Sequence, residues 1–248
     1  MKCAYSTNIG AKRKINQDAC LAAEITNNGT EYYVFAAADG LGGHRSGEVA
    51  SQMAVDFIKD FLPEVNDYSD PVEMDRFVND INSEIVRASI HDPELSGMAT
   101  TLTLCILGDG KLDIIQIGDS RAYRINKKGI SRLTKDHSLV QMLIDEGRLS
   151  PEDAARHPQK NVITRALGTD SMVSIDLYEY EVKSGDTFLV CTDGLYNMVP
   201  EEEIYSIVSE NAPESAVKQL INLANENGGS DNITVMVFNS EGDAADDQ

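Results

Sequence analysis

Four acidic residues stand at the ends of apolar, strand-like segments, and this arrangement constrains the fold more than any other feature. Asp39 follows YYVFAAA, Asp119 follows LDIIQIG, Asp193 follows TFLVCT, and Asp231 with Asn232 precedes ITVMVF. Runs rich in aromatic and β-branched residues predict buried strands, and Asp-Gly after Asp39 and Asp193 predicts turns. Antiparallel pairing of such strands would bring the four carboxylates to one edge of the fold.

The order of strands and helices predicts an α+β fold. Strands that follow one another through short Gly-containing turns indicate antiparallel sheets rather than the strand–helix alternation of a parallel sheet. We therefore expect a four-layer αββα sandwich, two antiparallel sheets flanked by helices. The expected strands are Cys3–Thr7, Ala19–Thr26, Glu31–Ala38, Met98–Leu107, Leu112–Ile117, Arg121–Ile125, Val173–Val182, Thr187–Cys191 and Ile233–Phe238, and the expected long helices end near Phe61, Ile90, Ser209 and Asn227.

The length and composition fit one domain. With 248 residues and 42% hydrophobic content, the chain can bury one large core. We expect a single domain over residues 1–240 and a solvated acidic tail over 241–248. Between 136 and 168 the strand pattern gives way to short helical pieces, Leu139–Glu146 and Pro151–Ala155. Such an insertion is typical of a flap that faces a substrate.

The charge and the apolar pattern exclude several classes of protein. A formal net charge of -20 argues against binding the backbone of a nucleic acid through a broad basic surface. No apolar stretch approaches the roughly 18 residues of a membrane span, and the N-terminus lacks the apolar segment of a signal peptide. We expect a cytoplasmic protein. The four cysteines show no CxxC spacing and are expected to be core thiols rather than metal ligands.

Carboxylates gathered at strand ends indicate hard divalent cations. Mg²⁺ and Mn²⁺ take oxygen ligands from a few carboxylates and backbone carbonyls and often keep several waters. Glycine after Asp39 and Asp193 lets the backbone approach an ion. Two such ions about 4 Å apart can activate one water for attack on phosphorus. The residues alone thus indicate metal-assisted hydrolysis of a phosphate ester, with structural carboxylates at turns as the alternative.

Six motifs, taken in chain order, resemble those of the metal-dependent protein phosphatases of type 2C, and most closely the compact bacterial serine/threonine phosphatases. They cover the chain from end to end, so their joint specificity is high although each alone is weak. The motifs are RKINQD (13–18), ADGLGGHRSGEVAS (38–51), GMATTLT (97–103), GDSRAY (118–123), CTDGL (191–195) and GGSDNIT (228–234).

The resemblance implies a centre of two Mn²⁺ or Mg²⁺ ions at one edge of the sandwich. Asp39 would bridge both ions, and Gly40 would lend its carbonyl to one of them. Asp193 and Asp231 would hold the other ion, and Asp18 would bind through metal-coordinated water.

The same resemblance assigns three further residues. Asp119 matches the residue that, with Asp193, holds a third and weaker ion in bacterial relatives. Arg13 matches the arginine that grips the substrate phosphate, for which a guanidinium is suited by its bidentate geometry. Asn232 would orient the neighbouring carboxylate.

One position departs from the family pattern. Eukaryotic members often carry a histidine directly after the Asp-Gly pair, where it is thought to protonate the leaving alkoxide, but this chain has Leu41. His44 could substitute only if the Gly42-Gly43 turn brought it back, so a metal-bound water is the preferred proton donor. His137, in KDHS, begins the flap and is assigned no catalytic role.

The resemblance therefore predicts a phosphatase that removes phosphate from serine or threonine by attack of a bridging hydroxide, without a covalent intermediate. By analogy it would oppose a bacterial serine/threonine kinase and act as a monomer. Two alternatives stay open: a non-catalytic module that binds phosphoproteins, and a phosphatase for small phosphate esters or for a single phosphorylated anti-sigma antagonist.

Overall fold

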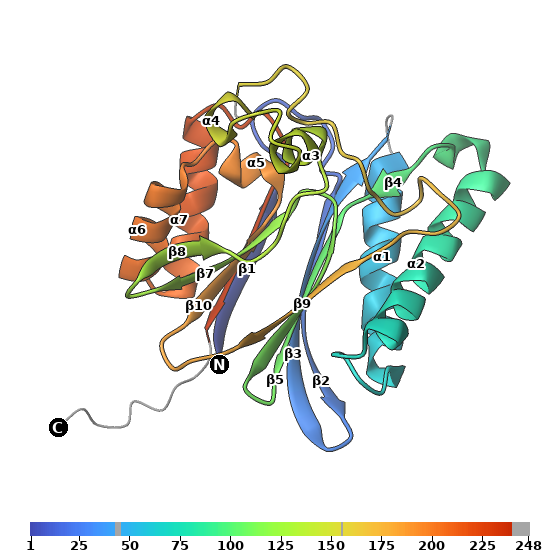
Figure 1. Cartoon of the computed structure of the whole chain (residues 1–248), viewed down its shortest axis with the longest axis horizontal. Helices are drawn as coiled ribbons and strands as arrows, with labels where there is room; N and C mark the ends of the chain where they lie inside the picture. The colour runs from blue at the N-terminus through green and yellow to red at the C-terminus, as the bar shows by residue number, and fades with distance from the viewer. Residues whose placement is uncertain (43–45, 155, 240–248) are drawn as a thin grey trace.

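Two antiparallel sheets pack against each other in the computed structural model, which describes residues 1–42, 46–154 and 156–239 (Figure 1). The predicted α+β sandwich is confirmed. The first sheet has the order β1 (Lys2–Asn8), β11 (Ile233–Asn239), β10 (Thr187–Cys191), β7 (Arg121–Asn126) and β8 (Gly129–Arg132). The second has the order β2 (Asp18–Asn27), β3 (Thr30–Leu41), β5 (Leu102–Gly108), β6 (Lys111–Ile117) and β9 (Asp176–Glu181), with β4 (Ala99–Thr100) paired to β3.

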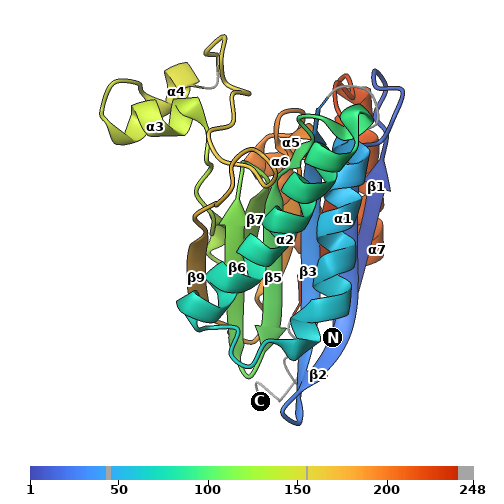
Figure 2. The same ribbon diagram turned by 90° about the vertical axis from the view of Figure 1, so that its right-hand side faces the viewer.

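Helices cover the outer face of each sheet. On the second sheet lie α1 (Ser46–Phe61) and α2 (Pro71–His91), each followed by a 3-10 turn, Leu62–Glu64 and Pro93–Leu95. On the first lie α6 (Glu201–Glu210) and α7 (Pro213–Glu226). Two short helices, α3 (Leu139–Asp145) and α4 (Pro151–Ala154), stand away from the sandwich at one end (Figure 2). In the described ranges, no helix has the length and apolar character needed to span a membrane.

Apolar residues of alternating direction on the strands fill the space between the sheets. Phe35 of β3 stacks on Phe238 of β11 with ring centroids 3.8 Å apart, and Phe188 of β10 lies 5.5 Å from Phe238. The three rings come from both sheets and are almost fully buried. Aromatic burial of this kind contributes strongly to core stability, so the sheets form a rigid support for the residues at their edge.

The helices bury faces with helical spacing. Phe77, Ile81 and Ile85 of α2 are buried as the sequence pattern predicts. In α1 the fully buried positions are Ala50, Ala54 and Ile58, whereas Phe61, which was expected on the buried face, remains 45% exposed. Small residues at the centre of this face let the helix approach β3 closely.

Several predicted boundaries differ from the structure. β3 continues through Asp39 and Gly40, so the turn predicted directly after Asp39 is wrong; cross-strand pairing with β2 extends the ladder there. The strand expected over Met98–Leu107 is divided at Thr101 into β4 and β5. Neither β8 nor the short helix α5 (Asp193–Tyr196) was predicted, because each has only four residues and shows no clear period.

Candidate metal centre

Asp18 and Asp39 are direct cross-strand partners. Asp18 is the first residue of β2, and the β2–β3 register places it opposite Asp39. Cross-strand partners in an antiparallel pair have Cβ atoms roughly 4.5–5.5 Å apart. Two like charges so placed destabilise the pair unless a proton or a cation lies between them.

The other three predicted carboxylates come from adjacent strands of the first sheet. Asp119 lies in the turn that carries the chain from β6 in one sheet to β7 in the other. Asp193 follows β10 and begins α5, and Asp231 precedes β11. Because β10 lies between β7 and β11, these three turns meet at one end of the sandwich.

A pocket of about 200 Å³ at this end, which we call the metal pocket, brings the predicted residues together. Asp39, Asp119, Asp193 and Asp231 line it, and Asp18 lies beside it across the β2–β3 ladder. The remaining lining residues are Arg13, Gln17, Gly40, Leu41, Gly42, Asn161, Ile163 and Asn232. Gln17, Asn161 and Ile163 were not predicted as site residues from the sequence; Gln17 directly precedes Asp18, whereas Asn161 and Ile163 lie in the flap segment, far along the chain from any of the predicted carboxylates.

Two carboxylate oxygens in this region are buried and have no hydrogen-bond partner among the described residues: Oδ1 of Asp18 and Oδ1 of Asp193. Oδ2 of Asp18 accepts from Thr192 Oγ1 at 2.9 Å and from Thr234 Oγ1 at 2.7 Å. Oδ2 of Asp193 accepts from Asn197 Nδ2 at 3.0 Å. Each carboxylate is thus held by one oxygen, and the other is left free to accept a further donor or bind a cation.

The surroundings of these carboxylates disfavour the charged form of each one. Burial, the largest cause in each case, raises the pKa of Asp18 to about 7, that of Asp193 to about 8 and that of Asp119 to about 6. The pKa of Asp39 rises well above its ordinary value, first through burial and then through the charge of Asp18. Bound cations would stabilise the charged forms of acids placed in this way.

The donor set fits an ion that keeps part of its water. No group of three or more His, Cys, Asp or Glu side chains within the described ranges forms a complete metal-binding cluster. Mg²⁺ is commonly held by one or two carboxylates and retains several waters. Carboxylates that lie apart around one pocket therefore suit Mg²⁺ and Mn²⁺. Oxygen-only ligands exclude a zinc site of the Cys/His kind.

Two glycines allow backbone segments at this end to approach closely, Gly40 of β3 to the start of α1 and Gly194 of α5 to the residue before β11. A Cβ on Gly40 would lie 2.1 Å from the carbonyl oxygen of Gly47, and one on Gly194 would lie 1.9 Å from that of Asn232. Any larger residue would force these backbones apart. Glycine is therefore required here by contacts between backbones, in addition to the approach to an ion that the sequence suggested.

Arg13 reaches the pocket from the loop between β1 and β2. Its Nη2 donates to Asp231 Oδ2 at 2.6 Å, and its side chain is 49% exposed. The Asn232 side chain accepts from the backbone N–H of Gln17 and donates to the carbonyls of Ile9 and Ile15, so it fixes this loop. The contact of Asn232 with the carboxylate of Asp231 is made by its backbone N–H at 2.9 Å, not by its side chain.

The family model described as Protein phosphatase 2C matches residues 10–236. The chain belongs to this family. The serine/threonine phosphatase stp of Listeria monocytogenes is 37% identical over 242 residues, covering 96% of this chain and 95% of the relative. The chain is accordingly a protein serine/threonine phosphatase of the bacterial subgroup.

Solved structures of phosphatases share the whole architecture. Stp1 from Staphylococcus aureus superposes with a TM-score of 0.88 at 33% identity, covering 98% of this chain and 96% of that one. The catalytic domain of PstP, described in complex with two manganese ions, has a TM-score of 0.80 at 34% identity and covers 95% and 96% of the two chains.

A buried network of hydrogen bonds joins Asp39 to the turn of Asp119. It was not predicted from the sequence. The backbone N–H of Asp39 donates to Thr101 Oγ1 at 2.9 Å, and that hydroxyl lies 3.0 Å from Ser120 Oγ. Gln116 Nε2 donates to the Ser120 carbonyl at 2.8 Å. Thr101, Ser120 and Gln116 are fully buried. The run Thr100-Thr101 inside an apolar strand was the available signal.

His137 lies at the base of the flap. Its Nδ1 accepts from the Gly118 N–H at 3.1 Å, and its Nε2 lies 3.2 Å from Asp176 Oδ2. Arg165 Nη1 contacts Asp176 Oδ1 at 2.7 Å. Leu41 lines the metal pocket, and His44 is outside the described residues.

Proposed function

We propose that this phosphatase hydrolyses phosphoserine and phosphothreonine in proteins with two divalent ions, Mn²⁺ or Mg²⁺, at the metal pocket. One observation carries the proposal: the buried, unpartnered oxygens of Asp18 and Asp193 lie in a set of carboxylates whose pKa values are raised. Such a set is suited to cations. PstP, described with two manganese ions, supports the same number here.

In the proposed arrangement, Asp39, the Gly40 carbonyl, Asp193 and Asp231 would hold the two ions, and Asp18 would act through water. When bound, ions of this kind lower the pKa of a shared water so that it can attack phosphorus, and they neutralise the phosphoryl oxygens. The hydroxyls of Thr192 and Thr234 keep Asp18 in place for this role.

Arg13 is the proposed phosphate-binding residue. Its guanidinium is half exposed and lies on a loop fixed by Asn232, so it can turn from Asp231 towards an incoming phosphoryl group. A guanidinium binds two oxygens of a phosphate in parallel. Asp231 would then be free to bind an ion.

A side-chain thiol is unsuited as the nucleophile. Cys191 is two residues from Asp193 but is fully buried, and burial raises the pKa of its thiol. Burial likewise raises the pKa of Cys20 to about 11. Neither group supplies thiolate at neutral pH, which favours direct attack by water. Leu41 has no proton to donate, so we assign protonation of the leaving alkoxide to water.

The wider assignments follow the family. We propose that residues 1–240 act as a single phosphatase domain in which residues 136–168 form the flap, and that the tail 241–248 is outside the catalytic unit. We further propose a cytoplasmic monomer that opposes a serine/threonine kinase. The relative named serine/threonine phosphatase stp supports the kinase assignment, since such an enzyme needs phosphorylated protein substrates.

Hydrolysis of p-nitrophenyl phosphate and of a phosphothreonine peptide tests the proposal. Both substrates should be turned over with Mn²⁺, and turnover should stop with chelator and in Asp39→Asn. Turnover without metal, or full activity of Asp39→Asn, would contradict the two-ion centre. Turnover of p-nitrophenyl phosphate alone would favour small phosphate esters as substrates.

Asp119→Ala tests the proposed third ion. Two ions should remain bound in this variant while turnover falls, because Asp119 is proposed to hold only the weaker site. The number of tightly bound ions is measured by elemental analysis and by a crystal structure with Mn²⁺. Loss of both core ions would overturn the assignment.

A further inference from the structure

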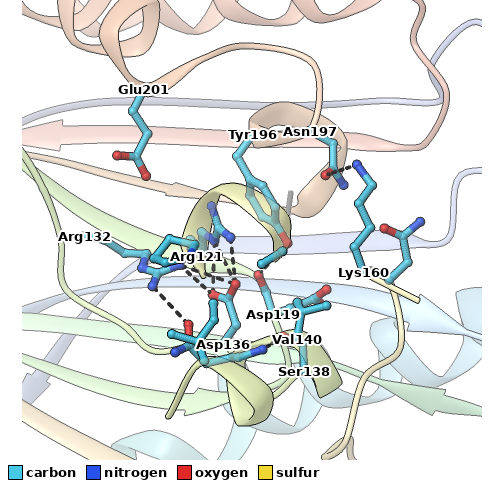
Figure 3. A pocket seen from close by; sticks show the side chains of 15 residues that line it. Asp119, Arg121, Arg132, Asp136, Ser138, Val140, Lys160, Tyr196, Asn197 and Glu201 are labelled. Carbon is cyan, nitrogen blue, oxygen red and sulfur yellow. Dashed lines mark hydrogen bonds and ion pairs between the residues drawn. The ribbon is translucent and has the colours of Figure 1, made fainter. Parts of the chain in front are cut away.

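A second and larger cavity, of about 580 Å³, adjoins the metal pocket and shares Asp119 and Asn161 with it. We call it the flap pocket, because α3 and α4 of the flap form one wall, with Val140 and Ile144 among the apolar lining residues. The beginning of α6 and the helix α5 form the opposite wall (Figure 3). A peptide whose phosphorylated residue occupies the metal pocket would extend into this cavity.

The floor of the flap pocket contains one complete ion pair. Arg121 donates to Asp136 from Nη2 at 2.7 Å and from Nε at 3.1 Å, and both side chains are largely buried. The guanidinium also stacks on the ring of Tyr196, 3.6 Å from its centroid. Arg121 is therefore fixed by Asp136 and by the ring of Tyr196.

Arg132 adds a second guanidinium to the same carboxylate. Its Nη1 lies 3.4 Å from both oxygens of Asp136, and its Nη2 lies 3.3 Å from Oε1 of Gln141. Figure 3 shows Arg121 and Arg132 both directed towards Asp136. One carboxylate cannot neutralise two guanidinium groups, so Arg121, Arg132 and Asp136 together carry one excess positive charge, while Asp119, the acid shared with the metal pocket, lines the same cavity. The long contacts of Arg132, whose side chain is 31% exposed, are weak ones.

Other charges of the cavity lie around this cluster. Lys160 donates from Nζ to the neutral amide oxygen of Asn197 at 3.3 Å, so its charge is also uncompensated by that contact. Glu201 lines the opposite wall in the first turn of α6, where the helix dipole stabilises it. In the described part of the chain, Glu201 forms no ion pair with Arg132 or Lys160. The positive side of the cavity is thus open to an external anion.

We propose that the flap pocket binds an anionic group of the phosphoprotein substrate, a carboxylate or a second phosphoryl group, and that Arg132 contacts it. The proposal rests on the proposed function, since it assumes a phosphorylated residue in the metal pocket. A guanidinium with weak internal contacts exchanges them readily for two strong bonds to a carboxylate or phosphate. Lys160 adds attraction at the border with the metal pocket.

The test uses phosphothreonine peptides of equal length in which a single glutamate is moved through each position on both sides of the phosphothreonine. For the native enzyme with Mn²⁺, kcat/KM should rise about tenfold over the all-alanine peptide at one favoured position, as expected for a bond between charged groups. In Arg132→Gln this ratio should fall to near one. In Arg132→Lys the ratio should be intermediate, because the positive charge remains and the bidentate geometry of the guanidinium is lost. The Lys variant also keeps the test valid if the Gln variant folds poorly.

Two matched variants complete the experiment. Arg148→Gln removes a flap arginine that is 68% exposed, contacts Glu146 and does not line the pocket, so its ratio should equal the native one. Glu201→Gln removes the opposing charge and should raise the ratio. A second peptide series with phosphoserine at the favoured position distinguishes the two sources of anion, since a ratio above that of glutamate identifies a second phosphoryl group.

Several results would overturn the proposal: equal kcat/KM for glutamate and alanine peptides at every position, or an unchanged ratio in Arg132→Gln. A preference that is the same at all positions would indicate general attraction and would also contradict it. These outcomes are distinct from failure of the proposed function, in which the native enzyme with Mn²⁺ would not hydrolyse the all-alanine peptide either.

Discussion

Two groups of acidic side chains lie at the same end of the molecule and differ in how their charge is compensated. At the metal pocket, Asp18 and Asp193 are buried with one oxygen each unpartnered, and their pKa values are raised. At the flap base, Asp176 contacts Arg165 and His137. Burial alone would raise the pKa of Asp176, but the hydrogen bonds from Arg165 and His137 lower it.

The contrast separates acids that await an external cation from acids that the protein neutralises itself. Carboxylates with their own cationic partners fix the position of a segment, here the base of the flap. Carboxylates gathered without such partners cost stability until an ion binds. A cation-binding acid and a structural acid can thus be distinguished by the cationic side chains around each carboxylate.

The largest effect should come from removing a metal-pocket carboxylate. Asp193→Asn should lower kcat/KM on p-nitrophenyl phosphate on the order of 10³-fold, because a lost metal ligand removes several kcal/mol of transition-state stabilisation. Without metal, the variant should be at least as stable as the native chain, since burial and the neighbouring acids already disfavour the charged form of Asp193. A metal-free melting temperature well below the native one would show that Asp193 has a structural role instead.

A smaller effect should follow from Thr101→Val, which keeps the shape of the side chain but removes the hydroxyl between Asp39 and Ser120. Groups that orient metal ligands typically contribute roughly 10–100-fold to metal affinity or activity. The Mn²⁺ concentration for half-maximal activity should rise by this factor. Thr103→Val is the comparison variant, because its hydroxyl contacts Gln116 at 2.8 Å and so lies further from Asp39 in the same network, where a smaller rise is expected. Equal effects of the two variants would point to packing alone.

The flap base should respond in stability and leave metal dependence unchanged. Asp176→Asn leaves Arg165 and His137 with a weaker partner, so we expect the free energy of unfolding to fall by about 1–3 kcal/mol. Urea denaturation with saturating Mn²⁺ measures this. A changed Mn²⁺ requirement in Asp176→Asn would remove the distinction between the two groups of acids.

The smallest effect concerns pH. Burial, the largest cause, lowers the pKa of His137 in the folded chain, so the folded state favours the neutral ring. Its contribution to stability should be complete above the unfolded pKa of about 6.5 and be lost as pH falls from there through the lower folded value. His137→Gln keeps an acceptor for the Gly118 N–H and should flatten this part of the curve of stability against pH. An unchanged curve would contradict the assignment.

The strands and long helices could be predicted because these segments are long enough to show a period of apolar residues. The carboxylates could be predicted because each adjoins such a strand. The sequence did not reveal that Asp39 lies inside β3, since the pairing with Asp18 that extends the strand is a tertiary contact. Thr101 looked like an ordinary β-forming residue. Its role depends on Ser120, which reaches it from a different turn.

The roles of single residues were less accessible than their positions. Asn232 was expected to orient a carboxylate, yet its side chain holds the loop of Arg13 by three hydrogen bonds. Local spacing cannot indicate this, because the partners lie more than 200 residues away in the chain. The excess positive charge near Arg132 likewise depends on a tertiary contact, since the carboxylate of Asp136 already forms an ion pair with Arg121.

The close approach of Gly194 to Asn232 affects how natural and engineered variants of this enzyme should be interpreted. With 1.9 Å between the added Cβ and the carbonyl oxygen, even alanine would push the start of α5 away from the residue that precedes β11, at the point where Asp193 and Asp231 lie. An inactive Gly194→Ala protein would therefore report a shifted backbone and not a missing chemical group. In a mutational scan, this position would be mistaken for a catalytic residue unless folding were measured separately.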